Sequence, residues 1–223
     1  MDTSPARRPA RPTRLAGRVV TIAPLDPDAH GDALYQATRA KEHDELFRYL
    51  FDGPFPDRAG FDVALRKKAS TDDPLFFAIL ENASGKAVGH ASYMRIEPGH
   101  RVIEVGSILY TPALQRSTGA TEAMYLMARH VFEDLGYRRY EWKCDARNAP
   151  SRSAAPRLGF TFEGIFRQHM IVKGENRDTA WYAMLDTEWP ERKSEFERWL
   201  DLANFDPAGR QLISLASLRS PTA

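Results

Sequence analysis

The sequence predicts an α/β (α+β) domain in which a mixed central β-sheet carries helices on both faces. Two observations predict this class. Three strand-like segments follow one another, at 74–82, 87–98 and 101–111, and helical segments then separate the remaining strands. A strand run that is interrupted by helices favours a mixed sheet covered on both sides. The chain has 223 residues, 43% of them apolar, which is enough for one such domain with its own core.

The elements before this strand run are predicted from caps and spacing. "RVVTIAPL" indicates a first strand, which Pro24 stops. "DPDAHGDALYQATRAK" has an aspartate that can cap a helix, a proline near the first turn, and helical spacing of Leu34 and Ala37. The elements expected in this part of the chain are a strand at 18–25 and helical segments at 26–41, 45–50 and 58–70.

The three consecutive strands are predicted from their apolar patterns. "PLFFAILEN" is apolar enough for a buried strand, and the turn "ASGK" joins it to "AVGHASYMRIEP", so the two segments form a hairpin. "RVIEVGSILYT" is the third strand, with apolar side chains at Val102, Val105 and Ile108. Glu104 interrupts this otherwise apolar strand.

A long helix is predicted after the third strand. Apolar side chains recur at the helical period of 3.6 residues, and Gly136 ends the pattern. The periodic positions are Ala120, Met124, Met127, Ala128, Val131 and Leu135. The elements expected after this helix are a strand at 138–145, a short helix at 148–160 closed by Gly159, strands at 161–172 and 178–186 joined by the polar turn 173–177, and a helix at 191–203 in which Trp199 and Leu200 pack on the body.

Composition and charge narrow the possible functions. The chain carries 31 basic and 30 acidic side chains, so its formal charge of +1 does not favour a nucleic-acid or membrane partner. No apolar run is long enough to span a bilayer. The single Cys144 allows no intramolecular disulfide and fits a reducing cytoplasm. The six histidines show no metal-ligand spacing, so no metal is expected.

The chain is expected to divide into three parts. Residues 1–14 contain three prolines and four arginines and no apolar core, which is typical of a disordered basic arm and not of a secretory signal. Residues 15–190 are expected to form the main folded domain. Residues 191–223 then form a C-terminal helix and a weakly determined tail.

The junction "LQRSTGATEA", Leu114 to Ala123, gathers small residues and an arginine where a strand leads into a helix. Small side chains let backbone N–H groups face a ligand, and the first N–H groups of a helix are unpaired and carry partial positive charge. Gln115 adds an amide, and Arg116 adds a guanidinium that suits phosphate oxygens. The pattern predicts a phosphate site, with an ordinary helix start capped by Ser117 or Thr118 as the alternative.

Three segments together resemble one family. "TPALQRSTGATEA", "NAPSRSAAPRLGFTFEGIFR" and "RDTAWYAMLDTEWP" occur in the order expected for the GCN5-related N-acetyltransferase (GNAT) superfamily, and the chain is similar to the branch of ribosomal-protein N-terminal alanine acetyltransferases. The resemblance covers residues 15–190. It implies the GNAT fold, in which the strand at 102–110 splays from the strand at 140–145, and it implies acetyl-CoA as co-substrate.

The resemblance also implies where acetyl-CoA binds. The family holds the pyrophosphate on a loop with the pattern Q/R-x-x-G-x-G/A, and Thr118 stands here at the place of the first glycine, where its side chain could crowd the pyrophosphate or donate a hydroxyl to it. The backbone of the splayed strand would hold the pantetheine and the thioester, and Asn148 and Arg152 would add contacts to the pantetheine arm and a phosphate. The cofactor-binding residues so implied are Ile108, Leu109, Tyr110, Gln115, Arg116, Ser117, Thr118, Gly119, Ala120, Asn148 and Arg152.

Acetyl transfer to an amine needs a base, donors for the oxyanion and an acid for the leaving sulfur. Glu104 is the predicted base. Burying a carboxylate on a core strand costs free energy, which indicates a specific role, and burial raises its pKa. An ion pair with Arg95 or Arg101, or a water held by several groups, is the alternative. Ser151 is the predicted acid, although Asn148 and Ser151 could simply cap the helix.

The predicted function is acetyl-CoA-dependent N-acetyltransfer, direct from the thioester to an amine of a peptide N-terminus or a small molecule. The alternative is a non-catalytic acyl-CoA-binding or sensing module with the same fold. Aromatic side chains beside acidic ones in "DELFRYLFDGPFPDRAGF" suit a cationic or amphipathic amine acceptor. We expect a cytoplasmic monomer or homodimer without direct nucleic-acid or membrane contact.

Overall fold

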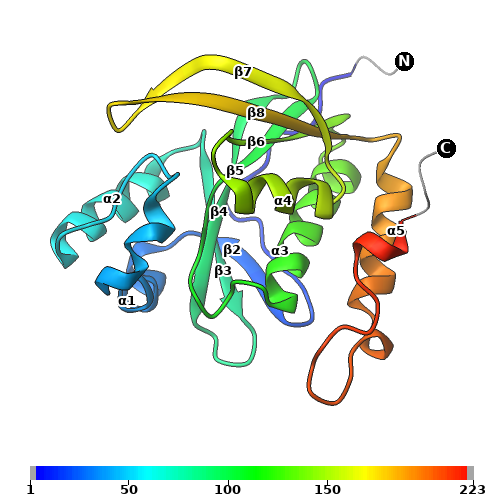
Figure 1. Ribbon diagram of the computed structural model, residues 1–223, viewed down its shortest axis with the longest axis horizontal. Coiled ribbons are helices and arrows are strands. Elements are labelled where there is room, and N and C mark those ends of the chain that lie inside the picture. Colours follow the sequence, from blue (N-terminus) through cyan, green and yellow to red (C-terminus); the bar gives the residue numbers. More distant parts are fainter. Residues whose placement is uncertain (1–3, 220–223) are drawn as a thin grey trace.

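The computed structural model describes residues 4–219 and contains an eight-stranded sheet with helices on both faces (Figure 1). The strand order is β1-β2-β3-β4-β5-β6-β8-β7. Neighbouring strands are antiparallel except for β5 and β6, which are parallel. The sheet is therefore mixed, and the predicted fold class is confirmed. Within residues 4–219, no helix has both the length and the apolar character needed to cross a membrane.

Each predicted strand is present, and a short one precedes them. The strands are β1 Leu15–Ala16, β2 Val20–Pro24, β3 Leu75–Glu81, β4 Ala87–Glu97, β5 Val102–Tyr110, β6 Arg139–Asp145, β7 Thr161–Val172 and β8 Glu175–Leu185. The start of β8 was predicted three residues too late. Lys173 and Gly174 both have positive φ, 51° and 79°, so two residues suffice to turn the hairpin.

The helices also follow the predicted order. They are α1 Pro27–Thr38, the 3₁₀ helix η1 Lys41–Phe47, α2 Arg58–Ser70, α3 Thr118–Arg129 with a wider π-helical turn at 130–134, α4 Ala149–Arg157 and α5 Trp189–Leu200. The Asp26 side chain caps α1 by accepting from the N–H groups of Asp28 and Ala29. The helical segment predicted at 45–50 is instead η1, which lies earlier and buries only Phe47.

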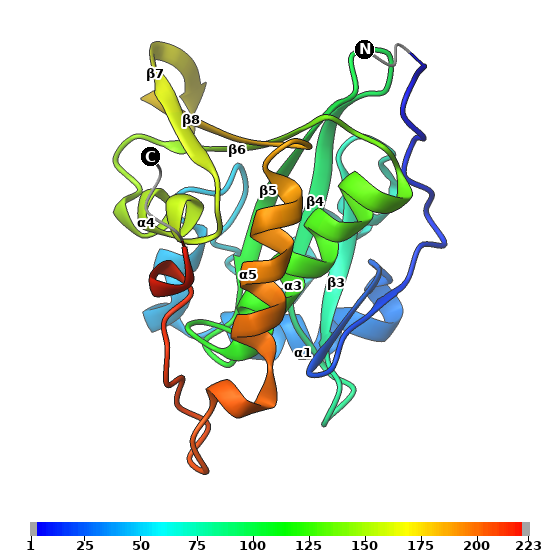
Figure 2. The same cartoon turned by 90° about the vertical axis from the view of Figure 1, so that its right-hand side faces the viewer.

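Helices cover both faces of the sheet (Figures 1 and 2), and an apolar core lies on each face. The larger one packs β1 to β6 and β8 against α3, α4 and α5, and includes Met127, Ala155 and Trp199. The smaller one packs β3 and β4 against α1 and α2, and includes Leu34 and Phe61. Trp199 is buried, as predicted, and α5 lies beside α3 (Figure 2).

Residues 4–14 run along the body of the protein. The Ala6 N–H donates to the Pro98 carbonyl at 3.0 Å and the Arg7 N–H to the Leu135 carbonyl at 2.8 Å. The Arg11 guanidinium donates to the Thr71 carbonyl and to the Asp72 carboxylate. These contacts use carbonyl and carboxylate acceptors within reach of the basic segment. Residues 1–3 lie outside the described part, and the disordered arm at 1–14 stays a prediction.

The parallel strands β5 and β6 separate partway along their length. They pair from Val102 with Arg139 to Val105 with Trp142, and beyond that point β5 pairs only with β4 and β6 only with β8. A bulge on β5 accompanies the separation: Ser107 has φ of 49°, and two β5 residues, Ser107 and Ile108, lie opposite one β4 residue, Ala91. The predicted splay of the central strand pair is confirmed.

Candidate active site

The helix that follows β5 begins with a side-chain cap. The Ser117 hydroxyl accepts from the Ala120 N–H at 3.2 Å and donates to the Leu114 carbonyl at 2.7 Å. The capped helix start and the phosphate site, alternatives in the sequence analysis, are compatible in the structure. The cap uses only one of the four unpaired N–H groups of a helix start. The N–H groups of Thr118 and Gly119 belong to the same first turn, so an anion can still bind there.

Gly119 is fixed by packing inside the protein. A Cβ added to this residue would lie 2.8 Å from Val20 Cγ1 and 3.3 Å from Leu114 Cδ1. Any side chain at this position would therefore push the start of α3 away from β2. Arg116, just before the helix, has φ of 56°, in the left-handed region that turns the chain into the helix.

The end of β5 is tied to this helix start. The Gln115 side-chain amide donates to the Tyr110 carbonyl, and the Tyr110 hydroxyl donates to the Ala120 carbonyl, both at 3.3 Å. Burial raises the pKa of the Tyr110 hydroxyl far above its usual value, so it stays protonated and can donate. Leu109 is buried, and Ile108 is half-buried against the larger core. The structure thus brings the predicted cofactor-binding residues 108–110 and 115–120 together.

Helix α4 borders the other side of the splay. The Asn148 side chain accepts from the Ser151 N–H at 3.1 Å, so Asn148 caps the helix. The Ser151 hydroxyl accepts from Trp142 Nε1 at 2.9 Å and also forms a hydrogen bond with the Cys144 sulfur. Arg152 is exposed and donates to the Ala146 carbonyl at 3.2 Å.

Cys144 lies mid-strand on β6 and is buried. Burial raises the pKa of its thiol, against a smaller opposing effect of a hydrogen bond with Ser151. A thiol with a raised pKa forms little thiolate, so this side chain is a poor nucleophile.

Glu104 is buried and forms two ion pairs. Its side chain is 3% exposed, and its Oε2 lies 2.6 Å from Arg95 Nη1 and 2.9 Å from Lys143 Nζ. Burial raises the pKa of the Glu104 carboxyl, while the positive charges of Lys143 and Arg95 oppose that rise. Both ion pairs use Oε2. The other oxygen, Oε1, would lie 3.4 Å from a Cβ on Gly106, the first β5 residue beyond the paired segment.

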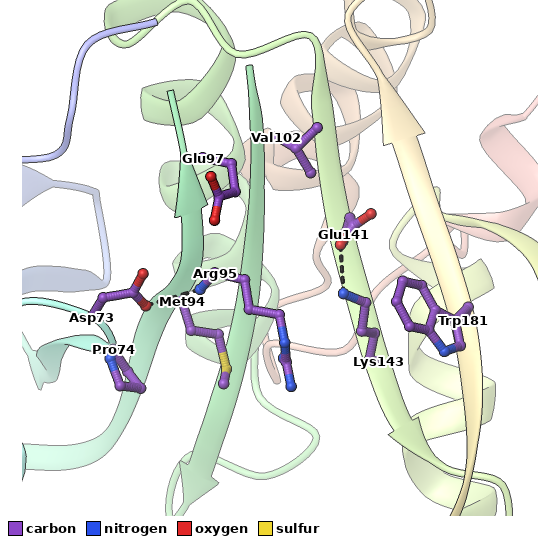
Figure 3. A pocket seen from close by; sticks show the side chains of 9 residues that line it. All are labelled: Asp73, Pro74, Met94, Arg95, Glu97, Val102, Glu141, Lys143 and Trp181. Atoms are coloured by element: carbon purple, nitrogen blue, oxygen red, sulfur yellow. Dashed lines mark hydrogen bonds and ion pairs between the residues drawn. The ribbon is translucent and has the colours of Figure 1, made fainter. Parts of the chain in front are cut away.

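Glu104 belongs to a row of alternating charges on the sheet face that carries α1 and α2. We call these five residues the charged row: Arg95, Glu104, Lys143, Glu141 and Arg139. Lys143 Nζ lies 2.6 Å from Glu141 Oε2 (Figure 3). Arg139 Nε lies 2.6 Å from Glu141 Oε1. The Lys143 side chain is 4% exposed, with its ammonium 3.8 Å from the centre of the Trp181 ring.

Three residues of the charged row, Arg95, Glu141 and Lys143, line an open groove of about 590 Å³ (Figure 3). Its walls come from the loop between α2 and β3 and from β4, β5, β6 and β8. The lining residues are Asp73, Pro74, Met94, Arg95, Glu97, Val102, Glu141, Lys143 and Trp181. Among residues 4–219, no group of three or more histidine, cysteine, aspartate or glutamate side chains is arranged to hold a metal ion.

Arg95 reaches Glu104 because of a second bulge, on β4. Its φ is 48°, and the register between β4 and β5 shifts between Met94 and Glu97. Asp73 holds the bulge, since its two carboxylate oxygens accept from the N–H groups of Arg95 and Ile96 at 2.9 and 3.0 Å. The left-handed conformation thus directs the guanidinium across the strand to Glu104.

The sequence reasoning did not identify Lys143 and Glu141. The strand "RRYEWKCD" does carry a signal, because charged residues at 139, 141 and 143 alternate with apolar ones and must share one face. What remained hidden is the parallel register, in which Glu104 lies opposite Glu141.

The aromatic segment predicted to shape the acceptor side has mixed roles. Phe47 is buried and packs edge-on against Phe55. The Tyr49 hydroxyl donates to the Arg147 carbonyl at 3.1 Å. Phe51 is 46% exposed, and the Asp52 carboxylate forms an ion pair with Lys68. The far end of the β7–β8 hairpin holds this segment, because Lys173 Nζ donates to the carbonyls of Phe47 and Gly53.

Comparison with known proteins accounts for this arrangement. The family model described as "Acetyltransferase (GNAT) domain" matches residues 20–161. The chain belongs to the GNAT family. Its computed structure is similar to a crystal structure described as a GCN5-related N-acetyltransferase from Brucella melitensis, with 48% identity, a TM-score of 0.94, and coverage of 96% of this chain and 97% of that one. This GNAT protein is therefore an N-acetyltransferase, and the predicted superfamily is confirmed.

Two relatives from Bacillus subtilis (strain 168) are also similar to this GNAT chain. "Uncharacterized N-acetyltransferase YnaD" is 24% identical over 157 residues, which cover 70% of this chain and 88% of YnaD. "Putative ribosomal N-acetyltransferase YdaF" is 27% identical over 109 residues, which cover 49% of this chain and 59% of YdaF. The second name agrees with the predicted similarity to the ribosomal-protein branch.

Proposed function

We propose that this protein is an acetyl-CoA-dependent N-acetyltransferase that moves the acetyl group directly from the thioester to an amine of a peptide N-terminus or a small molecule. One observation carries the proposal. The strands β5 and β6 part after Val105 and Trp142, beside a helix start with unpaired N–H groups. This opening offers backbone donors to an extended ligand and an anion site at one end of it.

The residues around the opening fit the co-substrate acetyl-CoA. Its diphosphate would bind the N–H groups at the start of α3, with Gln115 and Arg116 beside it. Its pantetheine arm would follow the β5 backbone at 108–110, with Asn148 and Arg152 on the side of α4. Acetyl-CoA supplies the activated acyl group, and a thiol pKa of about 8.5 makes the thiolate a fair leaving group.

Glu104 is the proposed base. An alkyl amine with a pKa near ~10.4 is protonated at neutral pH and must lose a proton before it attacks. The raised pKa of the buried Glu104 carboxyl brings it closer to the operating pH. Its Oε1 takes no part in the two ion pairs and lies beside Gly106, where the opening begins.

Main-chain N–H groups and Ser151 complete the proposed machinery. The N–H groups of β5 at 108–110 that face the opening would stabilise the negative charge that develops on the carbonyl oxygen. Ser151 would donate its proton to the departing sulfur by turning its O–H away from Cys144, while its oxygen keeps the hydrogen bond from Trp142.

The acceptor site lies on the face of the charged row. We propose residues 15–190 as the catalytic domain, with 191–223 as a C-terminal helix and tail, and we place the reaction in the cytoplasm, which suits a protein with one unpaired thiol. The name of YdaF makes ribosomal-protein N-terminal peptides one acceptor class to test, beside small amines.

The test is release of CoA from acetyl-CoA, followed with a thiol reagent, across a panel of small amines and N-terminal peptides. We expect release that depends on one acceptor class, with mass spectrometry showing one acetyl group added to its amine. Binding of acetyl-CoA in a calorimetric titration, without turnover on any acceptor, would contradict the proposal and favour the sensing module.

A further inference from the structure

Arg177 is a buried arginine on β8 that the proposed machinery does not use. The residue is 7% exposed. It lies two residues from Thr179, which pairs with Asp145 at the end of β6, so it extends past the last residue of that strand. Arg177 therefore sits where β5 and β6 are farthest from pairing with each other.

The Arg177 guanidinium has no hydrogen-bond or ion-pair partner within residues 4–219, and its contact there is with the ring of Phe51. Its Nε is fully buried without an acceptor. An unpaired buried charge costs several kcal/mol, so arginines at such depth normally face a carboxylate. Burial is also the main influence on the pKa of Arg177, which it lowers, as expected for a cation without a close anion.

The nearest acid is already engaged. The Asp145 carboxylate accepts from the Arg147 guanidinium at 3.0 and 3.2 Å and from the Arg147 backbone N–H at 2.8 Å. These three bonds to one residue hold Asp145 as the anchor of the turn after β6. The charge of Asp145 raises the pKa of Arg177, but no hydrogen bond joins the two side chains.

Arg177 lies on the same face of β8 as Trp181, because residues an even number apart along a strand share a face. The Trp181 ring contacts the Lys143 ammonium at 3.8 Å, so Arg177 is on the face of the charged row. The charges of Glu104 and Arg95 also influence Arg177. The centre of the Phe51 ring lies 5.5 Å from the guanidinium carbon, and Phe51 is 46% exposed.

We propose that Arg177 binds a carboxylate carried by the acceptor, and that the acceptor is a small amine with a carboxylate on the same molecule, as in an amino acid. The proposal rests on the proposed function. A guanidinium presents paired N–H donors that match a carboxylate, and binding would remove the unpaired charge. The amine of the same molecule would then face Glu104, which lies on the same sheet face and whose charge influences Arg177.

The test compares each acceptor with its own carboxamide. Alanine, serine, methionine and phenylalanine would be paired with their amides, and kcat/KM for acetyl-CoA-dependent CoA release measured for each. We expect at least one pair to favour the carboxylate by tenfold or more. In Arg177→Gln that preference should fall to twofold or less, while Arg198→Gln, which removes an exposed arginine of α5, should keep it.

Stability separates this role from a structural one. Because Arg177→Gln breaks no ion pair, we expect its Tm to stay equal to or above that of the unchanged protein. Equal rates for acid and amide, a preference that survives Arg177→Gln, or equally fast acetylation of peptides without a nearby carboxylate would overturn the proposal. So would an Arg177-dependent preference for succinyl-CoA over acetyl-CoA, since the carboxylate would then be carried by the acyl group.

A binding measurement keeps the inference separate from the proposed function. If no acceptor turns over, the transferase proposal fails, but the anion site can still be tested by titrating the N-acetyl derivatives of the same four amino acids, and the amides of these derivatives, into the CoA-bound protein. Tighter binding of the acids by tenfold or more, lost in Arg177→Gln, would support the site. Equal binding of acids and amides would overturn it.

Discussion

The two sides of the splay are built differently. The proposed cofactor side relies mainly on main-chain groups, the start of α3 and the free length of β5, with the Asn148 side chain at the cap of α4 beside them. The proposed acceptor side consists of side-chain charges, the charged row and Arg177, supplied by strands far apart in the sequence, and most of these charges are buried. The cofactor side therefore depends on the path of the backbone. The acceptor side depends on how its partly buried charges neutralise one another.

This difference has consequences for substitution. A backbone site tolerates changes of side chain as long as the chain path is kept, because N–H groups are present in every residue except proline. A buried charge network does not, because removing one partner leaves another charge unpaired. We therefore expect single substitutions to have larger effects on the acceptor side.

The largest expected effect is on Glu104. Glu104→Gln removes the proposed base while Lys143 keeps its ion pair with Glu141, so the fold should persist. We expect kcat/KM to fall about 1,000-fold, in the range for loss of a general base, with the Kd of CoA unchanged. In the unchanged protein kcat/KM should rise with pH through the raised pKa of Glu104, since only the deprotonated carboxylate accepts a proton.

The matched control is Glu97→Gln, which changes an exposed carboxylate of the same groove. It should leave both the rate and its pH profile unchanged. A fall of less than tenfold in Glu104→Gln would remove the base assignment and favour a water held by several groups.

The second effect concerns the balance of the charged row. Lys143→Met removes one ion pair from each of two buried carboxylates. Glu104 retains its ion pair with Arg95, and Glu141 retains its ion pair with Arg139. We expect a loss of about 3 kcal/mol in the free energy of unfolding, measured by urea titration. Since the charge of Lys143 lowers the pKa of Glu104, its removal should raise that pKa further and move the acid limb of the rate profile to higher pH.

Lys193→Met is the control for this prediction. Lys193 forms an ion pair with Glu133 at the surface, where both side chains are about a third exposed. Such pairs contribute about 0–1 kcal/mol, so the change should be small. Equal losses in the two variants would show that burial does not govern the charged row.

The same contrast explains what the sequence could predict. The caps of α3 and α4 are short patterns, because Ser117 binds Ala120 and Asn148 binds Ser151, each three residues further on. The starts of both helices could therefore be located from the sequence. The contact between Glu104 and Lys143 depends on a parallel register across 39 residues, and that between Arg95 and Glu104 on a bulge held by Asp73. Neither has a local pattern.

Arg177 shows the same limit. In the sequence it stands in "KGENR", which was predicted as a polar turn and so as exposed. The tighter turn at Lys173 and Gly174 brings Arg177 into β8 and buries it. A difference of three residues in one turn thus decided whether a charged side chain was expected at the surface or in the site.

The third prediction tests the cofactor side through its backbone. Gly119→Ala places a Cβ 2.8 Å from Val20 Cγ1, so the helix start must shift. We expect a loss of about 1–3 kcal/mol in stability from overpacking. The Kd of CoA should rise about tenfold, since the displaced N–H groups are the ones proposed to hold the co-substrate.

Gly99→Ala is its control, because a Cβ there would meet nothing within 4 Å. Calorimetric titration with CoA should give the same Kd for Gly99→Ala as for the unchanged protein. An unchanged Kd in Gly119→Ala, with stability lowered, would mean that the start of α3 does not bind the diphosphate.

The smallest expected effect is at Thr118, where the family pattern has glycine. The residue begins α3, and its N–H is one of the unpaired groups of the first turn whatever its side chain. Thr118→Gly should therefore change the Kd of CoA by less than threefold, and Thr118→Ser, which keeps the hydroxyl, should match the unchanged protein. Affinity that rises tenfold in Thr118→Gly would show that the side chain crowds the pyrophosphate. A tenfold fall that Thr118→Ser avoids would show that its hydroxyl donates to the phosphate, and the cofactor side would then depend on side chains as the acceptor side does.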